Sequence, residues 1–214
     1  MKVGVLGSGG VGQTLAAGFL KHGHEVMMGT REPAKLAEWA KAHPKARIGS
    51  SSEAAAFAEM VVLVVKGDGA ADALRLAGKA NLAGKPVIDA CNPIADAPPD
   101  HGVLRLYTKP TESLMEQLQK EFKEAHLVKA FNSVGAGEMI NPQYPGGIRP
   151  TMFICGNSEG AKKTVTGILD QFGWETADMG TAEAARAIEP LCMLWCILGF
   201  TKNEWTHAFK LLRV

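Results

Sequence analysis

A glycine-rich turn near the start of the chain is the stretch best suited to chemistry. It runs Gly7, Ser8, Gly9, Gly10, Val11 and Gly12. An apolar run typical of a buried strand precedes it at residues 3–6, and an apolar stripe at helical spacing follows it at 15–20. In this context Gly7 permits the tight turn, Gly9 lets the backbone approach a pyrophosphate, and Gly12 lets the helix pack against the strand. Because the free N–H groups at a helix start favour anions, the pattern predicts a dinucleotide site.

The end of the second predicted strand indicates which dinucleotide is bound. NAD enzymes place an acidic residue roughly twenty positions after the last glycine, where it binds the ribose hydroxyls. This chain has Thr30 and Arg31 there, and Lys35 follows on a predicted helix. These groups suit the additional 2′-phosphate of NADP, which a carboxylate would repel. The alternatives are that the charges are simply solvated at a helix start, or that Glu32 is an NAD-type acid displaced by one position. We favour NADP(H).

Further candidate cofactor contacts stand where other predicted strands end, since ligands of an open parallel sheet bind beyond the carboxyl ends of its strands. These candidates are Val65, Lys66, Asn92, Pro93, Ala130 and Asn132. The two amides and the lysine offer hydrogen bonds to a nicotinamide carboxamide or ribose. A purely structural explanation also exists, because Asn commonly ends strands and Pro93 cannot continue a ladder.

No arrangement of acid–base or nucleophilic residues stands out, so the catalytic residues stay unknown and no metal site is predicted. His101 and Tyr107 lie in a long loop and are candidate substrate contacts. Cys192 and Cys196 share a predicted helix face without nearby histidines, which favours buried thiols over a metal site. The missing acid–base pair suits hydride exchange between NADPH and a flavin-like ring, because the cofactors supply the reactivity and the protein supplies orientation.

The composition is that of a soluble globular protein. Of the 214 residues, 46% are hydrophobic and 21% are charged, and the formal net charge is +1, which gives no reason to expect a nucleic-acid or anionic-membrane partner. No secretory signal is visible, because Met1 and Lys2 lead directly into the first predicted strand. The longest apolar stretch, 191–200, is shorter than the roughly twenty residues of a membrane span. We therefore expect a cytoplasmic protein without a membrane partner.

Strands and helices alternate along most of the chain. Strands are predicted at 3–6, 25–28, 47–49, 60–65, 86–91, 127–132, 151–155 and 174–177. Helices are predicted at 15–20, 34–42, 54–58, 70–80, 112–124 and 158–172. This alternation predicts a Rossmann-type α/β fold, a doubly wound, mainly parallel sheet with helices on both faces. The stretch 94–110 shows no periodicity, and a loop of this length is usually functional or disordered.

The end of the chain has a different pattern. We predict an NADP-binding Rossmann domain over residues 1–179 and a short helical C-terminal extension over 180–214, with helices at 182–200 and 204–212. The run 191–198 is apolar on every side, and such a helix must be buried all round. Because so short a segment cannot enclose it, we expect it to pack against a second subunit in a two-fold homodimer.

Several short runs together resemble the coenzyme F420-dependent NADP oxidoreductases and their bacterial relatives, over nearly the whole chain. They are Gly7–Gly12, Gly29–Arg31, Asp89–Pro93, Val128–Asn132 and Phe153–Asn157, followed by Asp178–Gly180, Ala185–Arg186 and Glu189. The resemblance implies that the residues from Ser8 to Val11 hold the pyrophosphate. It also implies that Thr30, Arg31 and Lys35 hold the 2′-phosphate. The deazaflavin would lie over the nicotinamide, in a cleft completed by the C-terminal helices of a dimer.

The chain departs from this family pattern near the second substrate. Members that use the deazaflavin tend to carry Pro and a bulky residue after the fourth strand, where this chain has Lys66 and Gly67. The loop 94–110 is also longer than expected. The predicted function is an NADP(H)-dependent oxidoreductase that transfers hydride between NADPH and a flat small-molecule acceptor, coenzyme F420 or a flavin. The alternatives are a non-enzymatic NADPH-binding redox sensor, or a small carbonyl or imine reductase with Tyr107 or Lys66 as proton donor.

Overall fold

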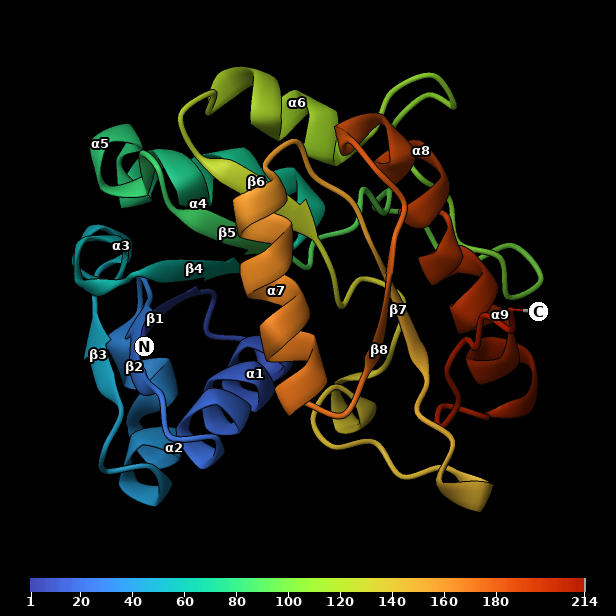
Figure 1. Ribbon diagram of the computed structural model, residues 1–214, viewed down its shortest axis with the longest axis horizontal. Coiled ribbons are helices and arrows are strands. Elements are labelled where there is room, and N and C mark those ends of the chain that lie inside the picture. The colour runs from blue at the N-terminus through green and yellow to red at the C-terminus, as the bar shows by residue number, and fades with distance from the viewer. Residues whose placement is uncertain (214) are drawn as a thin grey trace.

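Six parallel strands form one sheet whose carboxyl ends all lie at the same edge. In the computed structural model, which describes residues 1–213, the strand order is β3-β2-β1-β4-β5-β6 (Figure 1). The strands are β1 (Lys2–Leu6), β2 (Glu25–Gly29), β3 (Arg47–Gly49), β4 (Met60–Leu63), β5 (Pro86–Asp89) and β6 (His126–Lys129). This is the strand order of dinucleotide-binding doubly wound folds, so the predicted Rossmann-type α/β architecture is confirmed. The order reverses beside β1, where such folds form their ligand crevice.

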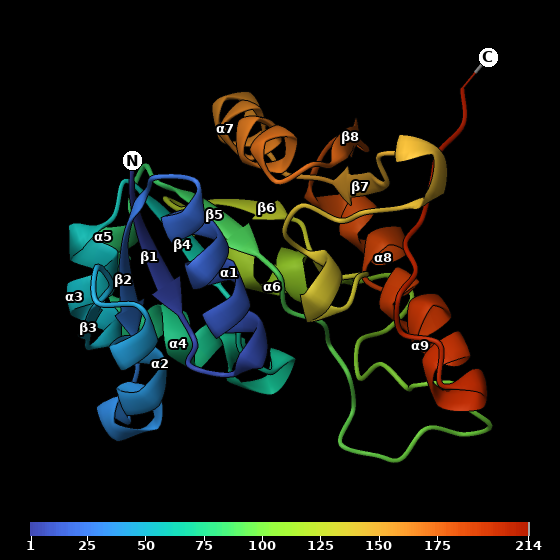
Figure 2. The same cartoon turned by 90° about the horizontal axis from the view of Figure 1, so that it is seen from below.

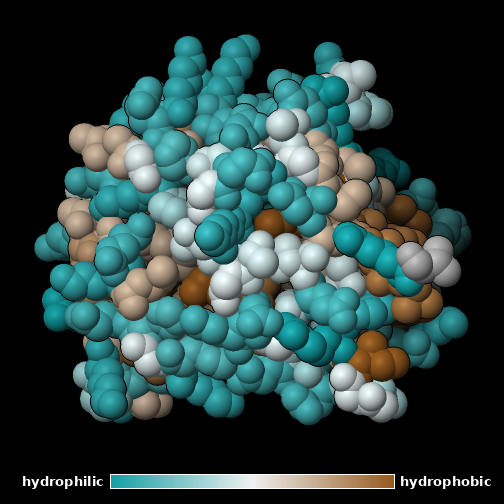
Figure 3. Space-filling view, viewed as in Figure 1, coloured by the Kyte–Doolittle hydropathy of each residue, from teal (hydrophilic) through white to brown (hydrophobic). Residues whose placement is uncertain are grey.

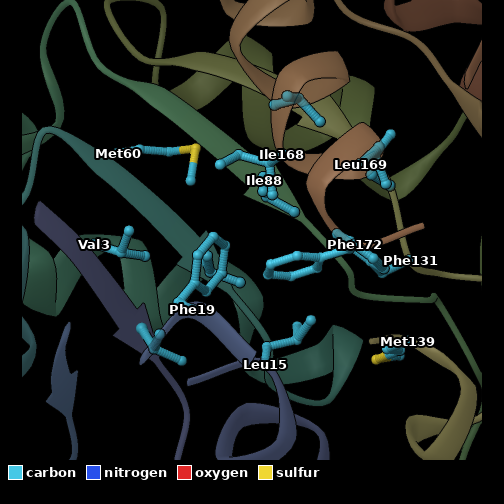
Figure 4. Close-up of a cluster of buried hydrophobic side chains, with 14 of the residues drawn as sticks. Val3, Leu15, Phe19, Met60, Ile88, Phe131, Met139, Ile168, Leu169 and Phe172 are labelled. Atoms are coloured by element: carbon cyan, nitrogen blue, oxygen red, sulfur yellow. The ribbon is translucent and has the colours of Figure 1, made fainter. Parts of the chain in front are cut away.

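Helices cover both faces of this sheet (Figure 2), and each face has its own apolar core. The helices are α1 (Gly10–Lys21), α2 (Ala37–Ala42), α3 (Ser51–Phe57), α4 (Ala70–Ala77), α5 (Lys79–Leu82), α6 (Leu114–Glu121) and α7 (Glu159–Gln171). On one face, Phe19 of α1 and Phe172 after α7 pack with ring centroids 4.9 Å apart (Figure 4). The opposite face is covered by α3, α4 and α6. Because both faces are covered, every residue of β4 is fully buried, which explains its continuous apolar sequence.

Two later strands do not join the main sheet as the simple alternation suggested. β7 (Thr151–Ile154) and β8 (Glu175–Asp178) pair only with each other, as a separate parallel sheet connected through α7. One isolated antiparallel bridge, between Lys129 and Cys155, links this pair to the end of β6. The chain therefore reverses direction after β6, and the small sheet lies beyond the edge of the large one.

The C-terminal segment is helical only in its first part. It contains the short turn η5 (Ala182–Ala184), then α8 (Ala185–Ile188) and α9 (Leu191–Lys202). The helix predicted at 204–212 is wrong, because Asn203 adopts a left-handed conformation with φ of 56° and ends α9. The following residues run extended beside β7, where the Thr151 N–H donates to Phe209 O at 2.8 Å. Hydrogen bonds to a strand edge thus replace those of a helix.

The stretch 182–202 is long and apolar enough to cross a membrane by length and composition alone. Only a third of its most apolar window is buried, 33%. Helical core segments of globular proteins share these properties. In this structure the stretch is interrupted at Pro190, which has no N–H to continue the helical hydrogen bonds, and it carries the buried carboxylate of Glu189.

The loop 94–110 is a narrow hairpin-like excursion rather than a structureless connection. Ile94 bridges Leu106 in antiparallel fashion, and the Tyr107 N–H donates to Pro93 O at 2.8 Å. At its tip, Gly102 lies against Thr201 and Phe200 of α9. The hairpin therefore extends from the carboxyl end of β5 to the C-terminal helix (Figure 2).

Candidate functional site

The glycine turn joins β1 to α1, and two of its glycines are required by the fold itself. Gly7 has a φ of +137°, which side chains of L-residues rarely adopt, and a Cβ atom there would overlap the carbonyl oxygen of Val64. A Cβ atom at Gly12 would overlap the carbonyl oxygen of Gly7. The strand, the turn and the helix therefore approach one another too closely for any side chain at these two positions.

Gly9 and Gly10 face open space instead. A Cβ atom at either position would meet nothing within 4 Å. These residues begin α1, where no side chain caps the helix and no acidic residue occupies the first turn of this described segment. The first N–H groups of the helix are thus free to bind an anion, as the positive end of the helix dipole favours. Ser8 and Val11 flank this cradle, and both are half-buried.

The residues after β2 line a cleft of ≈ 330 Å³ beside the turn. Thr30 Oγ1 donates a hydrogen bond to Ser8 Oγ at 3.2 Å and accepts one from the Glu32 N–H at 3.0 Å. Lys35 Nζ lies 2.8 Å from Glu32 Oε1, and its hydrogen bond and charge lower the pKa of Glu32. Arg31 is exposed and forms no ion pair with the residues that the structure describes. The cleft thus brings together a fixed hydroxyl, an exposed guanidinium and a lysine engaged by a carboxylate.

A second cleft of ≈ 410 Å³ lies between the turn after β4, residues 65–68, and the segment 90–97 after β5. Val65, Lys66 and Asp68 line both clefts. The two hollows therefore adjoin along the carboxyl edge of the sheet. Together they offer an extended site that begins at Arg31 and ends at Asn92.

The two asparagines predicted at this edge are bonded to each other. Asn92 Nδ2 donates to Asn132 O at 2.7 Å, and Asn132 Nδ2 donates to Asn92 Oδ1 at 3.2 Å and to Ile188 O at 2.9 Å. Asn92 lines the second cleft, whereas Asn132 is only 4% exposed. Pro93 and Ala130 are buried as well. Of these four predicted residues, Asn92 alone lines the second cleft, and the other three are buried.

The two candidate loop residues are placed differently. The Tyr107 ring lies beside Gly67, whose Cβ would approach the tyrosine hydroxyl to 3.0 Å. Burial, with the nearby carboxylates of Glu189 and Asp68, raises the pKa of Tyr107 to about 12. The His101 side chain is 98% exposed at the hairpin tip. Tyr107 therefore lines a neighbouring hollow, which shares Gly67 and Asp68 with the second cleft, while His101 lines neither.

The cysteine pair on α9 resembles structural thiols. Cys192 is buried and Cys196 is half-buried, and burial raises the pKa of the Cys192 thiol to about 12. Within residues 1–213 no group of three or more His, Cys, Asp or Glu side chains is arranged to hold a metal ion.

Comparison with known proteins places this site in a family. The family model described as "NADP oxidoreductase coenzyme F420-dependent" matches residues 2–93. A protein of Arthrobacter sp. FB24, whose crystal structure is described as that of a candidate F420-dependent NADP reductase, matches with a TM-score of 0.93 and 36% identity, covering 100% of both chains. The chain belongs to the coenzyme F420-dependent NADP oxidoreductase family. It is therefore an NADP-dependent oxidoreductase.

Other relatives of this NADP oxidoreductase match less completely. Metalloreductase STEAP3 of Rattus norvegicus is 29% identical over 190 residues, which are 89% of this chain and 36% of that protein. The chain thus spans about a third of that relative. An imine reductase of Streptomyces aurantiacus shares the fold with a TM-score of 0.68 at 17% identity, covering 91% of this chain and 61% of the reductase chain.

The site geometry of the NADP oxidoreductase fits its dinucleotide. Gly9 and Gly10 leave a hollow at a helix start that the packing of the protein does not need. Arg31 offers an exposed planar cation in the same cleft, directly after β2, where the residue that recognises the ribose or its 2′-phosphate is expected. These two features are separate observations, and both match NADP(H), the cofactor of the family.

Three charged residues lie buried together beneath this site, an arrangement that the sequence did not predict. Asp89, Lys129 and Glu189 are at most 1% exposed and form one ion cluster. Asp89 and Lys129 are the last residues of β5 and β6 and lie opposite each other in register. The available signal was a charged residue inside each of two otherwise apolar strand runs.

The two tyrosines of the NADP oxidoreductase provide a test of partial burial by pH titration, since Tyr107 is 43% exposed and Tyr144 is half-buried. Burial raises the pKa of Tyr107 and of Tyr144 to about 12 each, against about 10 for a free tyrosine. Because both folded pKa values are raised, the associated stability is present below about pH 10 and is lost as the pH rises toward 12. We expect the phenolate absorbance of the native protein to rise with a midpoint near 12. In concentrated guanidinium chloride the midpoint should fall to about 10. A midpoint near 10 already in the native protein would contradict the burial of these side chains.

Proposed function

We propose that this protein transfers hydride between NADP(H) and a planar acceptor, coenzyme F420 or a flavin, held in the cleft between residues 65–68 and 90–97. The observation that supports this most is that the two clefts adjoin at Val65, Lys66 and Asp68. A dinucleotide anchored by its 2′-phosphate at Arg31 then extends past this turn. Its nicotinamide end lies in the second cleft, next to Asn92.

Each part of the chain has a separate task in this arrangement. The N–H groups of α1 at Gly9 and Gly10 bind the pyrophosphate, and the Arg31 guanidinium binds the 2′-phosphate. Lys35 also binds the 2′-phosphate, once its side chain has been released from Glu32. Asn92 offers its amide to the nicotinamide carboxamide or ribose. When bound, the nicotinamide supplies the hydride chemistry.

The second cleft suits an acceptor that needs little acid–base help. Its ionisable side chains among the residues described are Lys66, Asp68 and Asp96, and all three are exposed. Solvent therefore reaches the edge of the acceptor and can exchange its proton. The contribution of the chain is orientation, which can itself accelerate a reaction strongly when the reacting atoms are aligned. Val65, Ala90 and Ile94 supply apolar surface for a flat ring.

The test is to follow NADPH absorbance after mixing the protein with NADPH and coenzyme F420, FMN or FAD. We expect oxidation with at least one of these planar acceptors and none with the acceptor omitted. Tight NADPH binding without oxidation by any of them would overturn the proposal in favour of a redox sensor. Turnover with imines or carbonyls that is lost in Tyr107→Phe or Lys66→Ala would overturn it in favour of the third alternative.

We further propose that α9 packs against a second copy of the chain. Leu194 is 55% exposed and Phe200 47%, and Trp205 after the helix is 38% exposed. Figure 3 shows apolar side chains gathered on the side where Figure 1 places α8 and α9. Since the hairpin 94–110 packs on α9 at Gly102, a two-fold contact here would also enclose the acceptor cleft.

A charge at the centre of this surface should separate the subunits. In Leu194→Glu, burying a carboxylate in an apolar interface costs about 3 kcal/mol or more, which weakens association at least about 100-fold. Sedimentation velocity should show a dimer for the wild type and a monomer for the variant. Leu76→Glu, which places the same change on a side chain 51% exposed on α4, should remain dimeric. A monomeric wild type would contradict the proposed interface.

A further inference from the structure

A fully buried ion cluster lies under the acceptor cleft. Lys129 Nζ is 2.7 Å from Asp89 Oδ2 and 2.9 Å from Glu189 Oε1, and the lysine side chain has no exposed surface. Although burial opposes a charged lysine, the two carboxylates raise the pKa of Lys129. Buried ion clusters seldom add stability over apolar packing of the same shape. The groups that this cluster holds in place therefore explain it better than a gain in stability does.

The cluster fixes the peptide that precedes Asn92. Lys129 Nζ donates to Cys91 O at 2.9 Å, and Asp89 Oδ1 accepts from the Cys91 N–H at 3.0 Å. The donor and the acceptor of one residue are thus both held by charged groups. Hydrogen bonds to ionised groups are stronger than neutral ones, so the backbone direction at Asn92 is closely defined.

The same cluster attaches the C-terminal segment. Glu189 accepts hydrogen bonds from the N–H groups of Leu114 and Met115, at 2.9 and 3.0 Å, where α6 begins. The neighbouring Ile188 carbonyl accepts from Asn132, whose amide also holds Asn92. Lys129 is therefore connected to the Asn92 side chain through its ion pair with Glu189, the adjacent Ile188 carbonyl and the Asn132 amide.

We propose that Lys129 is a positioning residue for hydride transfer: with Asp89 and Glu189, it sets the direction of the Asn92 amide at the acceptor cleft. This inference rests on the proposed function, since that places the nicotinamide beside Asn92. An apolar residue of similar size could fill the space of Lys129, but it could not hold the Cys91 carbonyl. Lys129 acts through Asn92 and does not itself reach the cleft.

The first variant to measure is Lys129→Met. We expect kcat with the planar acceptor to fall about 10- to 100-fold, as for a misplaced reacting group. The dissociation constant of NADPH should stay within about twofold, because Arg31 and the glycine turn are separate from the cluster. Equal loss of kcat and affinity, or an unchanged kcat in a folded variant, would overturn the proposal.

The pH profile gives a readout that a merely structural role would not change. Without Lys129, Asp89 and Glu189 face each other, and one of them takes up a proton as the pH falls. The other ionisable neighbours are Cys91, Cys155, Cys192 and Tyr107, whose pKa values are all raised, so they stay neutral. The kcat ratio of Lys129→Met to wild type should therefore decline as the pH rises from about 5 to 8. In Lys129→Met/Glu189→Gln this decline should vanish; a persistent decline would contradict the assignment.

Lys162→Met is the matched control. Lys162 is also a buried lysine between two carboxylates, with Nζ 2.7 Å from Glu159 and 2.9 Å from Asp178, but it lies on α7 away from both clefts. This variant should keep kcat and its pH profile. Should Lys129→Met fail to fold, Glu189→Gln keeps the Lys129–Asp89 pair, and we expect it to show the same selective loss of kcat. Retention of wild-type kcat in Glu189→Gln would overturn the proposal.

A measurement without turnover separates this inference from the proposed function. The fluorescence lifetime and anisotropy of bound NADPH report how firmly the nicotinamide is held. We expect both to decrease in Lys129→Met and to stay at the wild-type values in Lys162→Met. If none of the tested acceptors supports NADPH oxidation by the wild type, the proposed function fails, yet this comparison still tests the cluster. If the lifetime and anisotropy of bound NADPH are the same in the wild type, Lys129→Met and Lys162→Met, the positioning role is overturned.

Discussion

Arg31→Ala should weaken NADPH binding about 10- to 100-fold while leaving NADH binding within about twofold. A hydrogen bond to a charged group contributes about 1.5–3 kcal/mol, and only NADPH carries the 2′-phosphate that receives it. Arg31 forms no ion pair within the described residues, so its whole charge is available to a ligand. Fluorescence titration with both dinucleotides measures the two losses side by side.

Two further variants show whether this loss belongs to the 2′-phosphate. Arg47→Ala removes an exposed arginine that pairs with Glu25 at 3.6 Å, away from the cleft, and should leave both affinities unchanged. Lys35→Ala should cost less than Arg31→Ala, because Glu32 already holds the lysine at 2.8 Å. Equal losses for NADPH and NADH in Arg31→Ala would refute the assignment of the 2′-phosphate site.

The parts of the molecule that the sequence predicted are those where one physical constraint acts locally. The glycine turn needs its glycines because β1 and α1 approach closely, and that requirement is visible as spacing alone. Strands β1, β4, β5 and β6 are buried on both faces over nearly their whole length, so their apolar runs stand out against amphipathic helices. The ends of parallel strands necessarily meet at one edge of their sheet, which is why the strand pattern alone groups Arg31, Lys66 and Asn92.

The parts that could not be predicted depend on contacts between distant segments. The residues after Asn203 have a composition compatible with a helix, but the edge of β7 provides hydrogen-bond partners that no local pattern reveals. Asn132 was predicted as a cofactor contact, and its burial follows from Ile188, which lies in another part of the chain. The ion cluster joins β5, β6 and the C-terminal segment, so Glu189 has no local signal that connects it to Lys129.

Gly9→Ala and Gly12→Ala should separate the two roles of the glycine turn. Gly9 has an extended backbone, φ −75° and ψ 177°, and open space around its Cβ position, so alanine fits and stability should change by less than about 0.5 kcal/mol. The added methyl group occupies the pyrophosphate cradle, however. We therefore expect NADPH and NADH affinities to fall together, by about 10- to 100-fold, since overpacking typically costs about 1–3 kcal/mol.

Gly12→Ala should show the opposite balance, with its main effect on stability. Its methyl group overlaps the Gly7 carbonyl oxygen, so the free energy of unfolding should fall by about 1–3 kcal/mol. This lowers Tm by roughly 2–12 °C in a chain of this size. Gly167→Ala on α7, where nothing lies within 4 Å, is the control and should raise Tm slightly, because alanine favours helix. Thermal unfolding and NADPH titration of the three variants measure both effects. The methyl group added at Gly9 contacts only a bound ligand, whereas the one added at Gly12 contacts the protein itself. An equal loss of Tm in both variants would therefore show that the fold, and not a dinucleotide, requires the space at Gly9.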